Sequence, residues 1–136
     1  MKPVSRRKFV QQSALVVASA SLPLPFAMST KKEVFVHQVY FWLKDPNSAA
    51  DRAALRAGLE KLRAIPVITF SHIGTAAPTR REVIDSSYDF SLLCFFKNGP
   101  DQDVYQTHPI HLEFVDTCKH LWQRVVVYDS IGEGQE

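Results

Sequence analysis

Residues 34–43 (VFVHQVYFWL) constrain the fold most, because they are β-branched and aromatic along their length and apolar on both faces of a strand. Side chains alternate along a strand, so Phe35 and Phe41 lie on one face while Tyr40 and Trp42 lie on the other. One layer of helices covers only one face, and monomers avoid a large apolar patch in water. The segment therefore predicts a central strand within a homodimer.

The rest of the chain alternates between helical and strand patterns. Ser48 with Asp51 resembles a capping box, and leucines at 55, 59 and 62 follow with helical spacing. The predicted elements are an amphipathic helix of about 17 residues that stops before Pro66, strands over 67–75 and 88–97, a short helix over 100–106, a helix that begins at Pro109, a strand over 124–128 and a tail over 132–136. This βαββαβ order predicts a ferredoxin-like α+β fold, with helices on one face of an antiparallel sheet.

The first 27 residues have the composition of an export signal. They contain four basic residues and no acid, and an uncharged apolar stretch follows the basic start. The pair Arg6-Arg7 followed by Phe9 is typical of a twin-arginine signal. We therefore expect a signal peptide over 1–27, a domain over 30–131, and a periplasmic protein without a stable membrane anchor after cleavage. An ordinary secretion signal and an uncleaved anchor helix are the alternatives.

The charge balance bears on the partners of the mature domain. Four of the 16 Lys and Arg residues lie in the signal, so the 14 acidic residues outnumber the remaining 12 basic ones. A nucleic-acid partner needs a basic surface to neutralise phosphates, so none is expected.

Three short motifs carry a family resemblance: His37 in the first strand, the triplet Tyr88-Asp89-Phe90, and YQTHPIH over residues 105–111. They resemble the stress-responsive α/β-barrel (Dabb) domain family, which implies a dimeric α+β barrel. The family includes olivetolic acid cyclase, which cyclises a polyketide thioester by an aldol reaction. The resemblance implies Tyr105 and His111 as a catalytic pair and His37 as a pocket residue, with Phe90 where the cyclase has a further pocket histidine.

The histidines also have a chemistry of their own. His111 lies in the first turn of its predicted helix on the buried stripe, where burial and the helix N-terminus favour the neutral imidazole and a pKa below about 6.5. A neutral imidazole beside the Tyr105 hydroxyl is a competent general base, and a hydrogen-bonded core histidine is the alternative. His108 precedes a proline and so lies at a corner, where a structural hydrogen bond is the alternative to a pocket role. We expect the pocket to include His37, His108, Phe90 and Trp42.

Metal and redox chemistry have weaker signals. His108 and His111 with Glu113 or Asp103 form an incomplete ligand set, so we expect no metal and no cofactor. Cys94 and Cys118 lie on apolar stripes and are predicted to be buried thiols, with a disulfide as the alternative.

Two functions follow from these observations. The first is a homodimer that binds a small apolar or carbonyl-containing molecule, with no reaction assigned. The second is a cofactor-free lyase or cyclase with Tyr105 and His111 as its acid/base pair. They differ in whether the cavity beside His111 is open or filled by side chains.

Overall fold

A four-stranded antiparallel sheet forms one layer of the domain in the computed structural model, which describes residues 31–135. Its strand order is β2-β3-β1-β4, with β1 in the interior of the sheet. The strands are β1 (Lys32–Leu43), β2 (Phe70–Gly74), β3 (Phe90–Phe96) and β4 (Trp122–Gly134). The order and direction of the strands confirm the predicted ferredoxin-like α+β fold.

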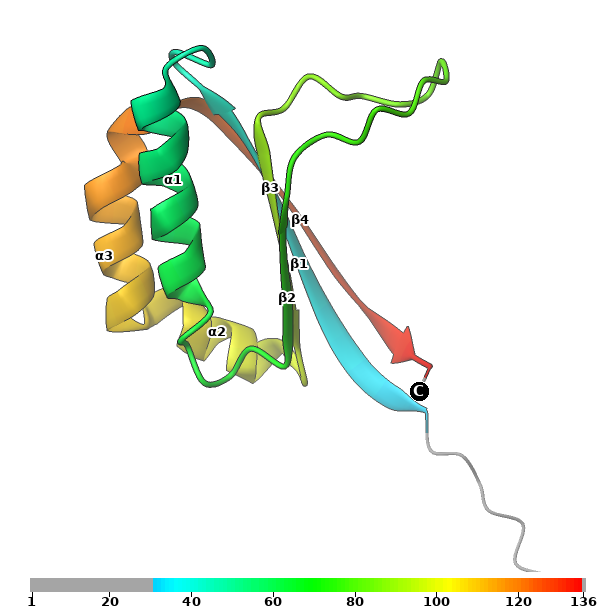
Figure 1. Cartoon of the computed structure of the whole chain (residues 1–136). Helices are drawn as coiled ribbons and strands as arrows, with labels where there is room; N and C mark the ends of the chain where they lie inside the picture. Colours follow the sequence, from blue (N-terminus) through cyan, green and yellow to red (C-terminus); the bar gives the residue numbers. More distant parts are fainter. Residues whose placement is uncertain (1–30, 136) are drawn as a thin grey trace, which may run out of the picture.

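The helices form the second layer and lie on one face of the sheet (Figure 1). They are α1 (Ala49–Leu62), α2 (Gly99–Thr107), α3 (Pro109–Cys118) and the 3₁₀ helix η1 (Lys119–Leu121). Ser48 caps α1 by accepting a hydrogen bond from the backbone N–H of Asp51 at 3.1 Å, as the sequence predicts. Asn98 caps α2 in the same way, through the N–H of Asp101 at 2.9 Å.

The two faces of β1 meet different surroundings. Val39, Phe41 and Leu43 point toward the helices and belong to the buried core, whereas Tyr40 and Trp42 on the opposite face are only half-buried. The prediction of a strand with two apolar faces is confirmed. We call the face that carries Tyr40 and Trp42 the outer sheet face.

Helices α1 and α3 approach each other closely at Gly58. A Cβ atom at this position would lie 2.6 Å from Sγ of Cys118 and 3.0 Å from Cδ2 of Phe114. The α1–α3 contact therefore depends on the missing side chain.

Several element boundaries differ from the sequence prediction. Helix α1 has 14 residues, and β2 begins only at Phe70. The prediction that residues 132–136 form a tail was wrong in part, because β4 continues to Gly134 opposite Lys32. The resulting β1–β4 ribbon extends beyond the helices (Figure 1). Pairing there rests on backbone hydrogen bonds, which leave no apolar pattern in the sequence.

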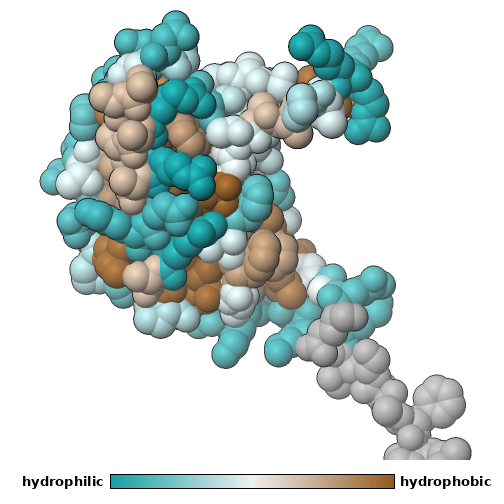
Figure 2. All heavy atoms as spheres, viewed as in Figure 1, coloured by the Kyte–Doolittle hydropathy of each residue, from teal (hydrophilic) through white to brown (hydrophobic). Residues whose placement is uncertain are grey.

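The long connection between β2 and β3 projects away from the helices on the side of the outer sheet face (Figure 1). Its tip is hydrophilic in Figure 2, consistent with exposed Arg80, Arg81 and Glu82. Within residues 31–135, no helix has both the length and the apolar character needed to cross a membrane. The predicted signal peptide lies outside the residues described.

Candidate functional site

A cavity of about 420 Å³ lies between the helix-facing side of the sheet and the helices α2 and α3. Its volume is in the range of sites that bind small molecules. Most of its wall is apolar, and the polar side chains come from four different elements. The lining residues are His37, Val39, Phe41, Leu92, Tyr105, Gln106, His111, Phe114, Val115, Trp122, Val125, Val127 and Asp129.

Tyr105 and His111 meet because the chain turns a corner between α2 and α3. Tyr105 lies in the last turn of α2, and His111 lies in the first turn of α3. His108 leaves the helical conformation, with φ −64° and ψ 138°, and Pro109 begins the next helix. The two ring centroids are 4.7 Å apart, so the sequence pattern and the fold bring this pair together at the cavity.

Burial sets the protonation states of the pair. Burial raises the pKa of Tyr105, and the nearby Cys94 thiol raises it further, so the hydroxyl keeps its proton at neutral pH. Burial lowers the pKa of His111; His37 also lowers it, and the backbone of Gln106 acts in the opposite direction. The expectation of a neutral His111 with a lowered pKa is confirmed.

His111 also holds an unsatisfied polar atom. Its side chain is buried, and its Nδ1 atom makes no hydrogen bond within the part of the chain that the structure describes. Buried polar groups in proteins are nearly always paired, and an unpaired one commonly marks a functional position. Nδ1 is shielded from solvent, and the ring itself forms part of the cavity wall.

A second polar pair stands on the sheet side of the cavity. His37 on β1 and Asp129 on β4 are opposite each other in the antiparallel register. Nδ1 of His37 lies 2.6 Å from Oδ1 of Asp129, and the His37 ring centroid is 5.5 Å from that of Tyr105. His37 therefore lies at the cavity, as expected from the resemblance. Sequence analysis missed Asp129, because only the strand register joins residues 92 positions apart.

The structure places the other three predicted pocket residues away from this cavity. His108 acts as the N-cap of α3, accepting a hydrogen bond from the N–H of Ile110 at 3.2 Å through Nδ1. Phe90 is buried in the core, and Cζ of the Arg52 guanidinium lies 5.1 Å from the centroid of its ring. Trp42 lies on the outer sheet face, because its position in β1 is of the opposite parity to that of His37.

Trp42 lines a different cavity, of about 300 Å³, on the outer sheet face. Its indole N–H donates to Oγ of Ser87 at 3.0 Å, and the Arg124 guanidinium lies 4.4 Å from its ring centroid. The remaining lining residues are Tyr40, Asp85, Tyr88 and Tyr128. Trp42 is thus separated by the sheet from His37, Tyr105 and His111.

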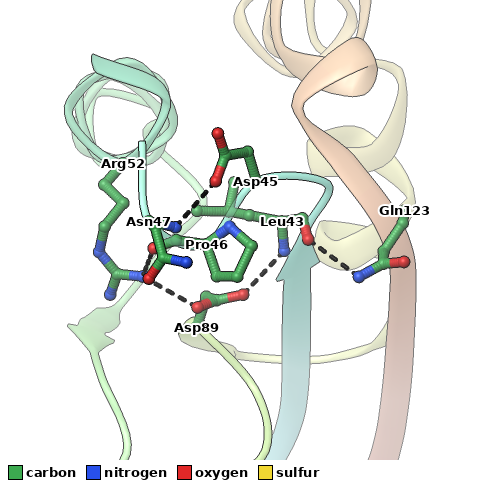
Figure 3. A network of polar contacts seen from close by, with 7 residues as sticks. All are labelled: Leu43, Asp45, Pro46, Asn47, Arg52, Asp89 and Gln123. Carbon is green, nitrogen blue, oxygen red and sulfur yellow. Dashed lines mark hydrogen bonds and ion pairs between the residues drawn. The ribbon is translucent and has the colours of Figure 1, made fainter. Parts of the chain in front are cut away.

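Asp89 has a structural role that the sequence did not reveal (Figure 3). One of its carboxylate oxygens accepts the backbone N–H of Leu43 at 2.8 Å, and the other accepts Nη1 of Arg52 at 2.9 Å. This carboxylate therefore joins the start of β3 to the end of β1 and to α1. The C-terminal end of β1, next to the cavity residue Phe41, is thereby held in place.

The structure also places the groups considered for metal and redox chemistry. Within residues 31–135, no three His, Cys, Asp or Glu side chains are grouped to hold a metal ion. Cys94 and Cys118 are buried free thiols, and burial raises the pKa of Cys94 to about 12.

Comparison with known proteins finds one matching family model and several solved structures with a similar fold. Residues 35–131 match the model of the Stress responsive A/B Barrel Domain (Dabb). No curated protein matches the chain.

Three solved structures illustrate the likeness in fold. A Dabb family protein with a ferredoxin-like fold from Mesorhizobium loti has 22% identity and a TM-score of 0.62, over 76% of this chain and 100% of that one. A hydroxynitrile lyase from Passiflora edulis has 20% identity and a TM-score of 0.62, over 76% and 96%. A dimeric ferredoxin-like protein of unknown function from Thermobifida fusca has 20% identity and a TM-score of 0.60, over 73% and 91%.

Proposed function

The chain belongs to the stress-responsive A/B barrel domain family, and we propose that it is an exported homodimer that binds a small carbonyl-containing or apolar molecule. The observation that carries this proposal is the open cavity of about 420 Å³ beside His111. Apolar walls with a few convergent polar groups are typical of small-molecule sites. A protonated Tyr105 hydroxyl supplies a hydrogen-bond donor for a carbonyl oxygen.

The outer sheet face supports the homodimer. It carries half-buried Val36, Tyr40 and Phe95, and Phe70 is 52% exposed. A second copy that covers this face would remove the apolar patch from water. The structurally similar protein from Thermobifida fusca is itself described as dimeric. Light scattering on the mature protein should give twice the mass of one chain, and a stable monomer at micromolar concentration would contradict this part of the proposal.

The export component rests on the sequence alone. The basic residues, the Arg6-Arg7 pair and the apolar stretch that follows favour delivery to the periplasm by the twin-arginine route.

A second candidate function is a cofactor-free lyase or cyclase. The specific observation in its favour is the pairing of a neutral His111 with a protonated Tyr105, at a ring-centroid distance of 4.7 Å. A neutral imidazole can accept a proton from a substrate while the phenol donates a hydrogen bond to its carbonyl oxygen. A protein with a similar fold, from Passiflora edulis, is a hydroxynitrile lyase.

Two measurements test the proposal and separate the candidates. Native mass spectrometry of protein purified from its own periplasm should reveal a retained small molecule, and benzaldehyde added to the free protein should shift NMR signals of cavity residues. Release of benzaldehyde from mandelonitrile, followed by ultraviolet absorbance, would favour the lyase. Binding without release would favour a binding protein.

Matched tyrosine variants locate the site. Tyr105→Phe and Tyr128→Phe each delete one hydroxyl, but Tyr128 lies on the outer sheet face, with 62% of its surface exposed. Tyr105→Phe should weaken benzaldehyde binding at least threefold, and Tyr128→Phe should leave it unchanged. Equal affinity in the two variants would place the ligand outside the proposed cavity.

A further inference from the structure

The hydrogen bond between His37 and Asp129 fixes the position of a proton. An ionised carboxylate can only accept hydrogen bonds, so at a separation of 2.6 Å the Nδ1 atom of His37 is the donor. The partners are held by their strands, because His37 and Asp129 face each other across the β1–β4 ladder. In the neutral imidazole, a proton on Nδ1 leaves Nε2 with a free lone pair.

The surroundings of His37 allow this lone pair to accept a hydrogen bond only from a group in the cavity. The ring is 5% exposed and packs against Phe96 and Tyr105, at centroid distances of 6.4 and 5.5 Å. Neither neighbouring ring face is a strong hydrogen-bonding partner. Since His37 lines the cavity, Nε2 is the polar atom that it can offer to a ligand.

The contact orients His37 and is not needed to join the two strands. Strands β1 and β4 are already joined by a backbone ladder along their whole length. The His37 side chain is 6% exposed and that of Asp129 is 43% exposed. Removal of Asp129 would leave the buried Nδ1 atom of His37 without a partner, so Asp129→Ala should be less stable than the wild type as well as lose the orientation of His37.

We propose that Asp129 is a positioning residue that holds the neutral form of His37 with Nε2 as a hydrogen-bond acceptor, so that the cavity selects a carbonyl compound that also carries a hydroxyl group. The Tyr105 hydroxyl donates to the ligand carbonyl, and the ligand hydroxyl donates to Nε2 of His37. This inference rests on the proposed function and extends it by naming a second polar group of the ligand.

The first test needs no ligand. Side-chain ¹⁵N chemical shifts of His37 should show the proton on Nδ1 in the wild-type protein and a shift toward the Nε2–H form in Asp129→Ala. Glu133→Gln is the matched control, because it removes an acid from the same strand outside the cavity and should leave His37 unchanged. A wild-type His37 with its proton on Nε2 would overturn the inference, even if the Asp129 variant failed to fold.

The second test compares two ligands that differ in one hydrogen-bond donor. The wild-type protein should bind 3-hydroxybenzaldehyde about tenfold more tightly than 3-methoxybenzaldehyde, because the methyl ether has no proton for Nε2. Asp129→Ala and His37→Phe should reduce this preference to less than about threefold, while Glu133→Gln retains it. A contact that served only the fold would change stability without changing this ratio.

The outcomes separate this inference from the proposed function. Binding of both aldehydes with equal affinity by the wild-type protein would overturn the role of His37 and Asp129 while leaving the carbonyl-binding cavity intact. A tenfold preference that survives in Asp129→Ala would also overturn it. Binding of neither aldehyde would contradict the proposed function itself.

Discussion

Replacing His111 by phenylalanine should stabilise the domain while it removes the base of the alternative lyase or cyclase reaction. Nδ1 of His111 is buried without a hydrogen bond in residues 31–135, and a buried unsatisfied polar group costs about 1–3 kcal/mol. Phenylalanine keeps an aromatic ring beside Tyr105, and the adjoining cavity of about 420 Å³ has room for its extra volume. We therefore expect the free energy of unfolding at pH 7.5 to rise by about 1–3 kcal/mol.

The pH dependence of this gain follows from the lowered pKa of His111. The folded protein holds this pKa below the ordinary value of 6.5, so the unfolded chain takes up a proton first as the pH falls. The wild-type protein should then lose up to about 1.4 kcal/mol of stability per pH unit below pH 6.5, until the pH reaches the folded pKa. His111→Phe lacks this loss, so its advantage should grow between pH 7.5 and pH 5.5.

Urea unfolding followed by tryptophan fluorescence measures both effects, at one fixed protein concentration because association shifts apparent stability. His120→Gln is the control, since it removes an exposed imidazole and should change the free energy of unfolding by less than about 0.5 kcal/mol. The reasoning is refuted if His111→Phe is less stable than the wild type at pH 7.5. It is equally refuted if the two proteins lose stability in parallel below pH 6.5.

Three further predictions concern other parts of the chain. Gly58→Ala gains about 1 kcal/mol of helix propensity but crowds Cys118 at a cost of about 1–3 kcal/mol, so urea unfolding should show a net loss that shrinks in a Cys118→Ala background. Replacing Arg6 and Arg7 by lysine should retain the precursor in the cytoplasm, as cell fractionation would show; undiminished periplasmic protein would exclude the twin-arginine route. Because burial raises the pKa of Cys94 to about 12, iodoacetamide at pH 8 should label it only in urea, and peptide mass spectrometry showing native-state labelling would disprove this.

The sequence predicts those features of the fold that depend on local patterns. The run of β-branched and aromatic residues around Phe41, the Ser48 cap and the break at Pro109 predict β1, α1 and the α2–α3 corner, and the structure has all three. These signals are local because each depends on neighbouring residues or on one periodicity.

The site residues that the sequence does not predict correctly depend on the pairing register of the strands and on the face of the strand that each residue occupies. Asp129 meets His37 only because β1 and β4 pair in one register, and no local pattern encodes that choice. The prediction that Trp42 lines the pocket is wrong because residues 37 and 42 are an odd number of positions apart in β1 and so lie on opposite faces of the sheet. The family resemblance predicts a pocket position for Phe90, but tertiary packing places this side chain in the core.

The corner between α2 and α3 sets the directions in which the Tyr105 and His111 side chains point. In one continuous helix, a separation of six residues would turn the second side chain by about 600°, which leaves the two about 120° apart around the axis and about 9 Å apart along it. The extended backbone of His108 and the proline after it cancel this rotation. Each residue inserted into a helix beside the corner would turn one ring away by about 100°. Related proteins that keep the pair should therefore keep the length of this segment, even where the surfaces of both helices have changed.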